Sequence, residues 1–501
     1  MSIGIVNSRA LLGIDAPRVR VEVFLSGGLP SFSVSGMAET AVRESKDRVR
    51  GAIINSGFRF PQERITVSLG PADMPKAGGR FDLAIALGIL VACRLLPQNA
   101  LDNVECYGEL GLDGDLKAVG GLLTAALKAR DAGAAMLVPA ASAAEPAFAH
   151  DCVYPMASLN EAAAHLKGTA PMSAVGRTPA GSQQRSIDDL SAVRGQARPK
   201  RALEIAAAGG HNLLLSGSPG TGKSLLARCL PGLLPDLNDA DALEVLAIES
   251  LLGSPPAHGA WRQPPFRSPH HTASAAALVG GGAGPQPGEI SRAHCGVLFL
   301  DELPEFSRHV LEVLREPLEN GRICIARANA QIDFPARFQL VAAMNPCPCG
   351  YLGDSHGQCR CSGERVSNYR ARISGPLLDR IDLTVDVERQ KAAVFRGSTR
   401  EEASAVVATR VAKVRKRQIE RQGSLNARVS AAMLEDVAAL DDASWVLLES
   451  AADTLGLSAR GMHRTLRVAR TIADLGERGA IEPSHVAEAL SLRDPAKKAG
   501  R

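Results

Sequence analysis

The chain has 501 residues, of which 45% are hydrophobic and 22% charged, and its formal net charge at pH 7 is +4. This composition is ordinary for a soluble globular protein, and the length predicts roughly three domains. So weak a charge neither requires nor excludes a polyanionic partner, and any nucleic-acid surface has to be local. We expect no signal peptide, because the start of the chain, residues 1–6, has no basic n-region and no long apolar segment. We expect no membrane span, because the longest apolar run, residues 83–93, is too short to cross a bilayer. The expected location is the cytoplasm.

Residues 1–167 are predicted to form one α/β domain. Valine and leucine at alternate positions between residues 19 and 25 indicate a half-buried strand. Further strands are predicted at residues 30–36, 65–69 and 135–139, and helices at residues 38–56 and from Phe81 onward. This pattern contains no decisive chemistry by itself.

The order of three motifs in this domain is similar to the protease domain of the Lon family. The motifs are Pro75-Lys76-Ala77-Gly78-Gly79, Gly108-Glu109-Leu110 and Gly120-Gly121-Leu122. The resemblance implies a ribosomal-S5-like fold, and in that family a serine and a lysine form the catalytic dyad. Their positions correspond here to Arg80 and Leu123. Since that mechanism needs a hydroxyl activated by an amine, we expect a Lon-like domain without protease activity, used for assembly or partner contact.

Residues 168–185 are rich in proline, glycine and serine, as in a linker. An ATPase core is expected over residues 186–395. It contains a segment that matches G-x-x-x-x-G-K-[ST] at every fixed position, between an apolar strand and a helix. The residues of this segment are Gly217, Ser218, Pro219, Gly220, Thr221, Gly222, Lys223 and Ser224.

This segment is a P-loop motif, and its residue types explain how it would bind phosphates. Glycines allow backbone N–H groups to turn toward phosphates, and a helix N-terminus adds favourable partial charge. Lys223 would reach the β- and γ-phosphates, and the Ser224 hydroxyl would bind Mg²⁺. The segment therefore predicts an ATP site. The alternative is an accidental glycine-rich loop.

Two later strands end in polar residues that would complete the ATP site. Residues 296–300 form an apolar strand followed by Asp301, which would hold Mg²⁺, and Glu302, which would act on the attacking water. A second apolar strand, residues 338–344, ends at Asn345, a position suited to hold the water or the γ-phosphate. Arg380 follows, and it is interpreted as an arginine that stabilises charge in a neighbouring subunit's site; the alternative is a solvated surface arginine.

Together these motifs resemble an AAA+ ATPase over residues 186–495. The resemblance implies that Asn345 is sensor 1 and that Arg380 is the arginine finger acting in trans. Residues 396–495 would form the C-terminal helical lid, which begins in a basic helical stretch at residues 399–421. In the lid, Arg460 matches the sensor 2 position best, and Arg464 is the second choice.

Four of the ten cysteines form two C-x-C pairs in a cysteine-rich insertion, residues 346–362: Cys347, Cys349, Cys359 and Cys361. Four thiolates on a glycine-rich loop can surround zinc tetrahedrally, so we predict a structural Zn²⁺ site. His356 could replace one ligand, and the alternative is four unliganded thiols. The scattered cysteines are interpreted as small buried hydrophobes: Cys93, Cys106, Cys152, Cys229, Cys295 and Cys324.

The sequence contains no base-reading module, so any DNA binding is expected to be independent of sequence. Mobile, modestly basic loops could contact phosphates in a central channel. Two segments are suitable, residues 265–288 and residues 322–337, which has arginines at 322, 327 and 337. The alternative is that these arginines make subunit contacts or lie in water.

The whole chain resembles the magnesium-chelatase-like ComM (YifB) family. The resemblance rests on the order of the domains and on three further motifs, at residues 269–274, 287–291 and 345–350. It implies a homo-hexameric ATPase that branch-migrates DNA in homologous recombination, notably during natural transformation of competent cells. The main alternative is a chelatase or MoxR-type AAA+ remodeller that acts on a protein partner for metal insertion. An ATP-dependent protease is a third possibility, and the missing serine and lysine argue against it.

Overall fold

The computed structural model describes residues 2–36, 39, 42, 44–176, 188–253, 261–282, 286–327, 330–354, 359–391, 394 and 401–493. The chain divides into two compact units. The first contains Met1–Gln183 and Ala240–Trp261, and the second contains Gln184–Asp239 and Arg262–Arg501. Among the described residues, no helix combines the length and apolar character that crossing a membrane requires.

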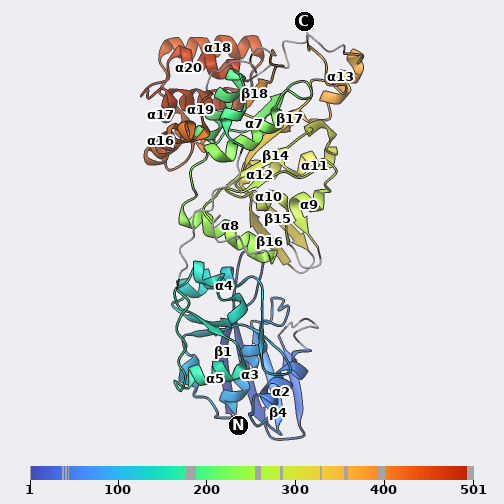
Figure 1. Ribbon diagram of the computed structural model, residues 1–501, viewed down its shortest axis with the longest axis vertical. Coiled ribbons are helices and arrows are strands. Elements are labelled where there is room, and N and C mark those ends of the chain that lie inside the picture. Colours follow the sequence, from blue (N-terminus) through green and yellow to red (C-terminus); the bar gives the residue numbers. More distant parts are fainter. Residues whose placement is uncertain are drawn as a thin grey trace. The chain divides into compact units, whose positions relative to one another are not determined.

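The first unit contains a seven-stranded mixed sheet (Figure 1). Its strands, in spatial order, are β3 (Ser31–Ser35), β4 (Arg64–Gly70), β2 (Arg18–Ser26), β1 (Ser2–Arg9), β5 (Val104–Cys106), β8 (Ala135–Pro139) and β9 (Val153–Met156). The β1–β2 and β2–β4 pairs are antiparallel, and the other neighbouring pairs are parallel. The predicted strands are therefore present, in a sheet that also includes the N-terminal segment.

The helices of the first unit are α2 (Ser45–Asn55), α3 (Asp82–Ala92), α4 (Leu122–Asp131), α5 (Leu159–Leu166) and α8 (Asp239–Leu251). Every residue of α3 is buried. A Cβ on Gly4 of β1 would lie 2.2 Å from the Gly88 carbonyl oxygen of α3, so glycine allows this helix and strand to pack closely. Helix α8 lies inside the segment predicted as ATPase core, yet its Leu243 and Leu246 share a buried cluster with α4.

Arg80 and Leu123, the two positions compared with the Lon dyad on the basis of sequence, are buried. The Arg80 side chain is only 6% exposed and donates to the carbonyl oxygens of Gly120 at 2.5 Å and of Arg9 at 3.4 Å. Burial lowers the pKa of this guanidinium. Leu123 is 1% exposed. A guanidinium bound to carbonyl oxygens and a buried aliphatic side chain supply neither the nucleophile nor the amine of a dyad mechanism.

The second unit is organised around a five-stranded sheet, parallel throughout (Figure 1). Its strands, in spatial order, are β11 (Phe266–Arg267), β14 (Val297–Leu300), β17 (Gln339–Met344), β10 (Leu213–Ser216) and β18 (Leu383–Asp386). The residues of β14 are all buried, which suits a strand covered on both faces. Because the strands are parallel, the residues that follow β10, β14 and β17 meet at one edge.

Smaller elements surround this sheet. They are α6 (Ala197–Gly209), α7 (Lys223–Cys229), α9 (Ala275–Val279), α10 (Glu289–Arg292), α11 (Arg308–Val313), α12 (Arg315–Asn320), α13 (Gly363–Arg370), α14 (Gly375–Leu378) and the strand pairs β12–β13 (Gly280–Gly281, Gln286–Pro287) and β15–β16 (Arg322–Arg327, Ala330–Pro335). On β15, Ile323 and Ile325 are buried whereas Cys324 is exposed, because neighbouring strand residues point to opposite faces. Cys152 is also exposed, and Cys93 and Cys295 are half-buried. The predicted burial is therefore confirmed for Cys106 and Cys229 and wrong for Cys152 and Cys324.

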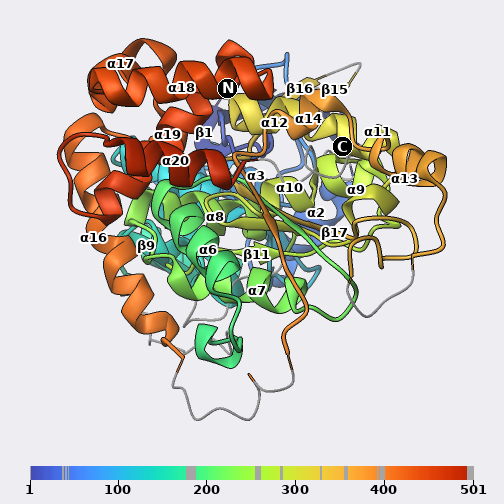
Figure 2. The same ribbon diagram turned by 90° about the horizontal axis from the view of Figure 1, so that it is seen from above.

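Within residues 401–493, the described part of the C-terminal region, the α-helices are α16 (Ser404–Gln422), α17 (Ala431–Ala438), α18 (Asp442–Leu455), α19 (Ala459–Leu475) and α20 (Pro483–Ser491). Figure 2 shows α16 and α19 beside α6, and apolar residues of all three helices belong to one core. The predicted helical stretch at residues 399–421 is therefore present as α16, with residues 395–400 outside the described part.

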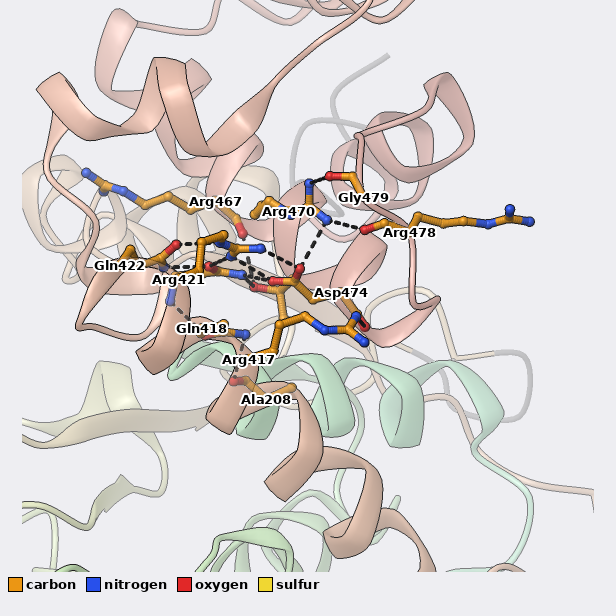
Figure 3. A network of polar contacts seen from close by, with 12 residues as sticks. Ala208, Arg417, Gln418, Arg421, Gln422, Arg467, Arg470, Asp474, Arg478 and Gly479 are labelled. Carbon is orange, nitrogen blue, oxygen red and sulfur yellow. Dashed lines mark hydrogen bonds and ion pairs between the residues drawn. The ribbon is translucent and has the colours of Figure 1, made fainter.

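A buried polar network ties α19 to α16 (Figure 3). The Asp474 carboxylate accepts from Arg421 at 2.8 and 3.0 Å and from the Asn426 amide at 2.9 Å, and it pairs with Arg470 at 3.0 Å. Arg470 also donates to the carbonyl oxygens of Arg478 and Gly479. Asp474 is 0% exposed and Arg470 is 1% exposed. Buried charges of this kind are tolerated when their hydrogen bonds are satisfied, as they are here for the carboxylate.

Candidate nucleotide-binding site

The P-loop runs from β10 into α7 at the carboxyl edge of the parallel sheet. Gly220 and Gly222 have φ values of 75° and 95°, a region that favours glycine. A Cβ on Gly217 would lie 2.3 Å from the Val387 carbonyl oxygen, so this position also requires glycine. The loop therefore turns tightly just before the helix N-terminus, where backbone N–H groups are available to an anion.

The Lys223 ammonium lies inside this loop. It donates to the carbonyl oxygens of Gly217 at 2.6 Å and Ser218 at 2.9 Å, and to the Asn345 side-chain oxygen at 3.2 Å. Burial lowers the pKa of Lys223, against the opposing effect of the Asp301 and Glu302 charges. A cation held by neutral oxygens in a glycine-rich turn is well suited to bind a phosphate.

Ser224 and Asp301 face each other across the same edge. The Ser224 hydroxyl donates to Asp301 Oδ2 at 2.6 Å, and the Glu302 backbone N–H donates to Asp301 Oδ1 at 2.9 Å. The residues that end three neighbouring strands thus come together, and we call Lys223, Ser224, Asp301 and Asn345 the P-loop cluster. A hydroxyl and a carboxylate side by side are oxygen ligands of the kind that Mg²⁺ prefers.

Glu302 does not join this cluster. Its side chain is 51% exposed, and its Oε2 lies 3.1 Å from Nδ1 of His271. Its backbone has a φ of 54°, which is uncommon for a residue other than glycine and is typical of functional sites. The sequence indicated His271 only as part of the candidate DNA segment at residues 265–288, and its contact with Glu302 was not predicted.

The predicted arginines lie apart from the P-loop cluster. The Arg380 side chain is 10% exposed, donates to the Pro376 carbonyl oxygen at 2.6 Å and pairs with Glu319 of α12. Arg460 is exposed in the first turn of α19. Arg464, one turn later, lies 3.8 Å from Asp382, and burial lowers the pKa of its guanidinium. These partners of Arg380 and Arg464 all lie outside the P-loop.

A cavity of about 1000 Å³ opens at the carboxyl ends of β10, β17 and β18. Its lining includes Ser216 to Ser218, Asp386 and the α18–α19 turn, residues 455–458. Burial raises the pKa of the Asp386 carboxyl. The volume of the cavity is at the upper end of the range for pockets that bind small molecules. The cavity therefore has room for a nucleotide beside the P-loop.

The four clustered cysteines lie together next to the P-loop. The Cys347 sulfur is 3.3 Å from that of Cys349 and 3.7 Å from that of Cys359, and all four Sγ atoms lie within 4.8 Å of one another. In a tetrahedron with Zn–S bonds of about 2.3 Å the sulfurs are about 3.8 Å apart. The spacing fits a zinc ion. His356, the alternative ligand, lies outside the described residues.

Two further observations bear on this cysteine cluster. The backbone N–H groups of Tyr351 and Arg360 lower the pKa of the Cys349 thiol to about 6, whereas burial and the neighbouring sulfurs raise the pKa of Cys359 and Cys361. Cys349 is therefore the thiol of this group that most readily forms a thiolate. Gly350, with a φ of 85°, leaves no space for a side chain, because a Cβ there would lie 2.6 Å from Pro219 of the P-loop. The segment that carries the cysteines, which follows Asn345 in the chain, therefore packs directly against the P-loop at Pro219.

Two segments are candidates for DNA contact on the basis of sequence. Residues 322–337 contain the antiparallel hairpin β15–β16, on which Arg322 is exposed, whereas the Arg327 side chain lies outside the described part. The Arg337 backbone N–H donates to His294 Nδ1 at 3.0 Å, so this residue has a partner within its own unit. Residues 265–288 contain the β12–β13 pair and the exposed His270, with residues 283–285 outside the described part.

Comparisons with known proteins agree with this architecture. Three family models match: magnesium chelatase, subunit ChlI, over residues 189–395; subunit ChlI of Mg-chelatase over residues 21–142; and the C-terminal part of magnesium chelatase subunit ChlI over residues 401–493. The chain is 47% identical over 501 residues to the uncharacterized protein YifB of Escherichia coli, covering 98% of this chain and 97% of that protein. It is 46% identical over 500 residues to the competence protein ComM of Haemophilus influenzae, covering 98% of each. The magnesium-chelatase 38 kDa subunit of Rhodobacter capsulatus is 29% identical over 183 residues, which are 33% of this chain and 52% of that protein.

Proposed function

Since the chain belongs to the ComM/YifB family of magnesium-chelatase-like proteins, we propose that it is an AAA+ ATPase that drives branch migration of DNA. The reaction would serve homologous recombination and the integration of transforming DNA, a setting that the name competence protein ComM of one relative supports. The observation that carries the ATPase proposal is the P-loop cluster at the edge of the parallel sheet. The protein would act in the cytoplasm, on DNA of any sequence.

The P-loop cluster fits Mg²⁺–ATP. The Ser224 hydroxyl and the Asp301 carboxylate, 2.6 Å apart, would hold the cation, which neutralises phosphate charge when bound. Lys223 would exchange its carbonyl partners for phosphate oxygens, and the P-loop backbone would bind the remaining ones. Asn345, which already contacts Lys223, would orient the attacking water beside the γ-phosphate. Glu302 would accept the proton of that water once its carboxylate turns toward the site.

The proposed active site is shared between subunits. The Arg380 guanidinium bonds to the Pro376 carbonyl oxygen and to Glu319, neither of which belongs to the P-loop cluster. Its proposed role is to stabilise charge on the ATP of a neighbouring subunit. This requirement supports a homo-hexameric ring. Arg460, exposed at the start of α19, would approach the nucleotide when the C-terminal helices close as a lid over the adjacent cavity.

The remaining parts of the chain have supporting roles in this proposal. Residues 1–167 would form a ribosomal-S5- and Lon-like domain without protease activity, joined by the linker 168–185 to the ATPase core at 186–395 and the lid at 396–495. The cysteine-rich insertion 346–362 would bind structural zinc through its four thiolates, since the sulfur spacing matches a tetrahedral site. Backbone phosphates of DNA would contact residues 265–288 and the hairpin within residues 322–337.

A chelatase or MoxR-type remodeller is the second candidate, because the family models are named for magnesium chelatase. One of these models covers residues 21–142, so the front domain does not separate the two functions. The extent of the matches supports branch migration as the proposal, because the chelatase subunit aligns with 33% of this chain, whereas ComM aligns with 98%. Branch migration is therefore the preferred function.

The rate of ATP hydrolysis with and without four-way DNA tests the proposal. We expect the purified protein to hydrolyse ATP faster with the junction than with no DNA. Glu302→Gln should still bind ATP and assemble, with turnover lost, because the amide cannot accept a proton. ATP turnover that is insensitive to forked and four-way DNA would favour a remodeller that acts on protein. Normal turnover by Glu302→Gln would contradict the role of Glu302.

A further inference from the structure

The side chain of Asn212 links the start of β10 to β17 and to the turn that carries Arg380. Asn212 directly precedes β10 and is half-buried, and the P-loop begins at the other end of the same strand. Its Nδ2 donates to the Arg380 carbonyl oxygen at 2.8 Å, and its Oδ1 accepts from the Leu340 backbone N–H of β17 at 2.8 Å. None of the roles proposed above uses Asn212 or these two bonds.

The backbone of Arg380 is held on both sides by hydrogen bonds. Its N–H donates to the Leu377 carbonyl oxygen of α14 at 2.9 Å, and its carbonyl oxygen accepts from Asn212. Beyond Ile381, the backbone N–H of Asp382 donates to the Asn212 carbonyl oxygen at 3.1 Å, and Asp382 Oδ2 accepts from the Asn212 N–H at 3.0 Å. The turn between α14 and β18, which carries Arg380, is therefore fixed to the start of β10.

The guanidinium of Arg380 is held less completely than its backbone. One Nη donates to the Pro376 carbonyl oxygen at 2.6 Å, and the other pairs with Glu319, whose side chain is 51% exposed. Nε is buried and has no hydrogen-bond partner among the residues that the structure describes. An ion pair with an exposed partner contributes little, and an unpaired buried donor is unfavourable. The side chain can therefore be redirected more readily than the backbone that Asn212 holds.

We propose that Asn212 is a positioning residue that fixes the backbone from which Arg380 extends toward the ATP of a neighbouring subunit. This inference rests on the proposed function, because it takes Arg380 as the arginine that acts in trans. The arginine side chain is long and flexible, so the place that its guanidinium reaches depends on where the backbone is held. A displacement of about 1 Å at a reacting group can lower a rate about 100-fold.

This arrangement would make β10 common to two ATP sites. The carboxyl end of the strand leads into the P-loop, which would bind the ATP of its own subunit. The amino end, at Asn212, would support the arginine that serves the next site. The two sites that share a subunit would therefore be connected through one strand of four residues.

Steady-state ATP hydrolysis by variants of the full chain tests this role. In Asn212→Ala we expect kcat to fall by about 10- to 100-fold, because one hydrogen bond is lost and the guanidinium is misplaced. KM for ATP should stay near the wild-type value, since Lys223 and Ser224 are unchanged. Adding Asn212→Ala to Arg380→Ala should cause no further fall in kcat, because Asn212 acts through that arginine. Mixing Asn212→Ala with Lys223→Ala should restore turnover, because the second subunit supplies a correctly held Arg380.

Two further variants separate this role from a structural one. Asn212→Asp keeps an oxygen for Leu340 and loses the donor to Arg380, so its kcat should fall in the same way. Gln339→Ala is the matched control, because this buried amide donates to the His211 carbonyl oxygen at 2.7 Å, one residue before Asn212, and not to Arg380. The kcat of Gln339→Ala should stay near the wild-type value.

The results that would overturn this inference differ from those that would overturn the proposed function. The positioning role of Asn212 is excluded by an unchanged kcat in Asn212→Ala, by an equal fall in Gln339→Ala, or by a further fall in the double variant. If Arg380→Ala mixed with Lys223→Ala stayed inactive, the action in trans would fail, while the double variant would still decide whether Asn212 acts through Arg380. Turnover that did not respond to DNA would contradict branch migration, and these comparisons, made without DNA, would still decide the role of Asn212.

Discussion

Replacement of Asp474 by alanine tests how the C-terminal helices α16 and α19 are held to each other. This carboxylate is the centre of the network in Figure 3, where it pairs with Arg421 and Arg470. It also accepts from the Asn426 amide at 2.9 Å. Removing it leaves two guanidinium groups without their counter-charge, and Arg470 is only 1% exposed. Water cannot reach this arginine to replace the lost carboxylate. Asp474→Ala is therefore expected to destabilise the bundle strongly.

The expected loss in the free energy of unfolding follows from the hydrogen bonds that each arginine retains. Breaking a buried ion pair by removing one partner costs about 3–5 kcal/mol. Arg470 keeps the carbonyl oxygens of Arg478 and Gly479, and Arg421 keeps the Asn426 side-chain oxygen. Because these bonds survive, we expect the low end of that range, about 3 kcal/mol in the free energy of unfolding.

Urea unfolding followed by tryptophan fluorescence measures this loss. The chain has two tryptophans, and a Trp261→Phe background leaves Trp445 of α18 as the reporter of the C-terminal helices. The matched control is Glu477→Ala, which removes an ion pair with Lys413 whose side chains are 60% and 63% exposed. Exposed pairs contribute about 0–1 kcal/mol. Equal losses in Asp474→Ala and Glu477→Ala would refute the argument from burial.

Three further substitutions test the proposed site. Ser224→Ala removes a predicted Mg²⁺ ligand, and the Mg²⁺ concentration at half-maximal ATP hydrolysis should rise; an unchanged Mg²⁺ requirement would exclude that role. Arg380→Ala should keep ATP binding and lose turnover by about 10³-fold or more, and mixing it with Lys223→Ala should restore partial activity because each subunit then supplies what the other lacks. No rescue on mixing would argue that Arg380 acts within its own subunit. Cys359→Ser should lower the zinc content of the purified protein below the wild-type value, measured by elemental analysis, and zinc-free wild-type protein would refute the metal site.

The sequence could predict that the four residues of the P-loop cluster lie close together, because their positions follow from local strand patterns. Lys223 and Ser224 follow one apolar strand, Asp301 ends a second and Asn345 ends a third, and parallel strands bring their carboxyl ends to one edge. The strand order β14–β17–β10 then makes these ends direct neighbours. The cysteine spacing likewise indicated four sulfurs close together, as the structure has them.

The contacts that the sequence did not predict are those made between elements far apart in the chain. His271 and Glu302 are brought together by the pairing of β11 with β14, which a single sequence does not reveal. Helix α8 is grouped with the first unit, and its Leu243 and Leu246 belong to the same buried cluster as residues of α4. In the sequence alone, the apolar residues of α8 are equally compatible with burial in the core of the predicted ATPase segment.

Strand exchange on a labelled four-way junction tests the central claim most directly. A junction whose arms can branch-migrate is mixed with the protein, and its conversion into two duplexes is followed over time. We expect conversion that requires ATP hydrolysis, that stops with Glu302→Gln, and that does not depend on the DNA sequence. Wild-type protein that hydrolyses ATP in the presence of the junction and leaves the junction unconverted would contradict the account.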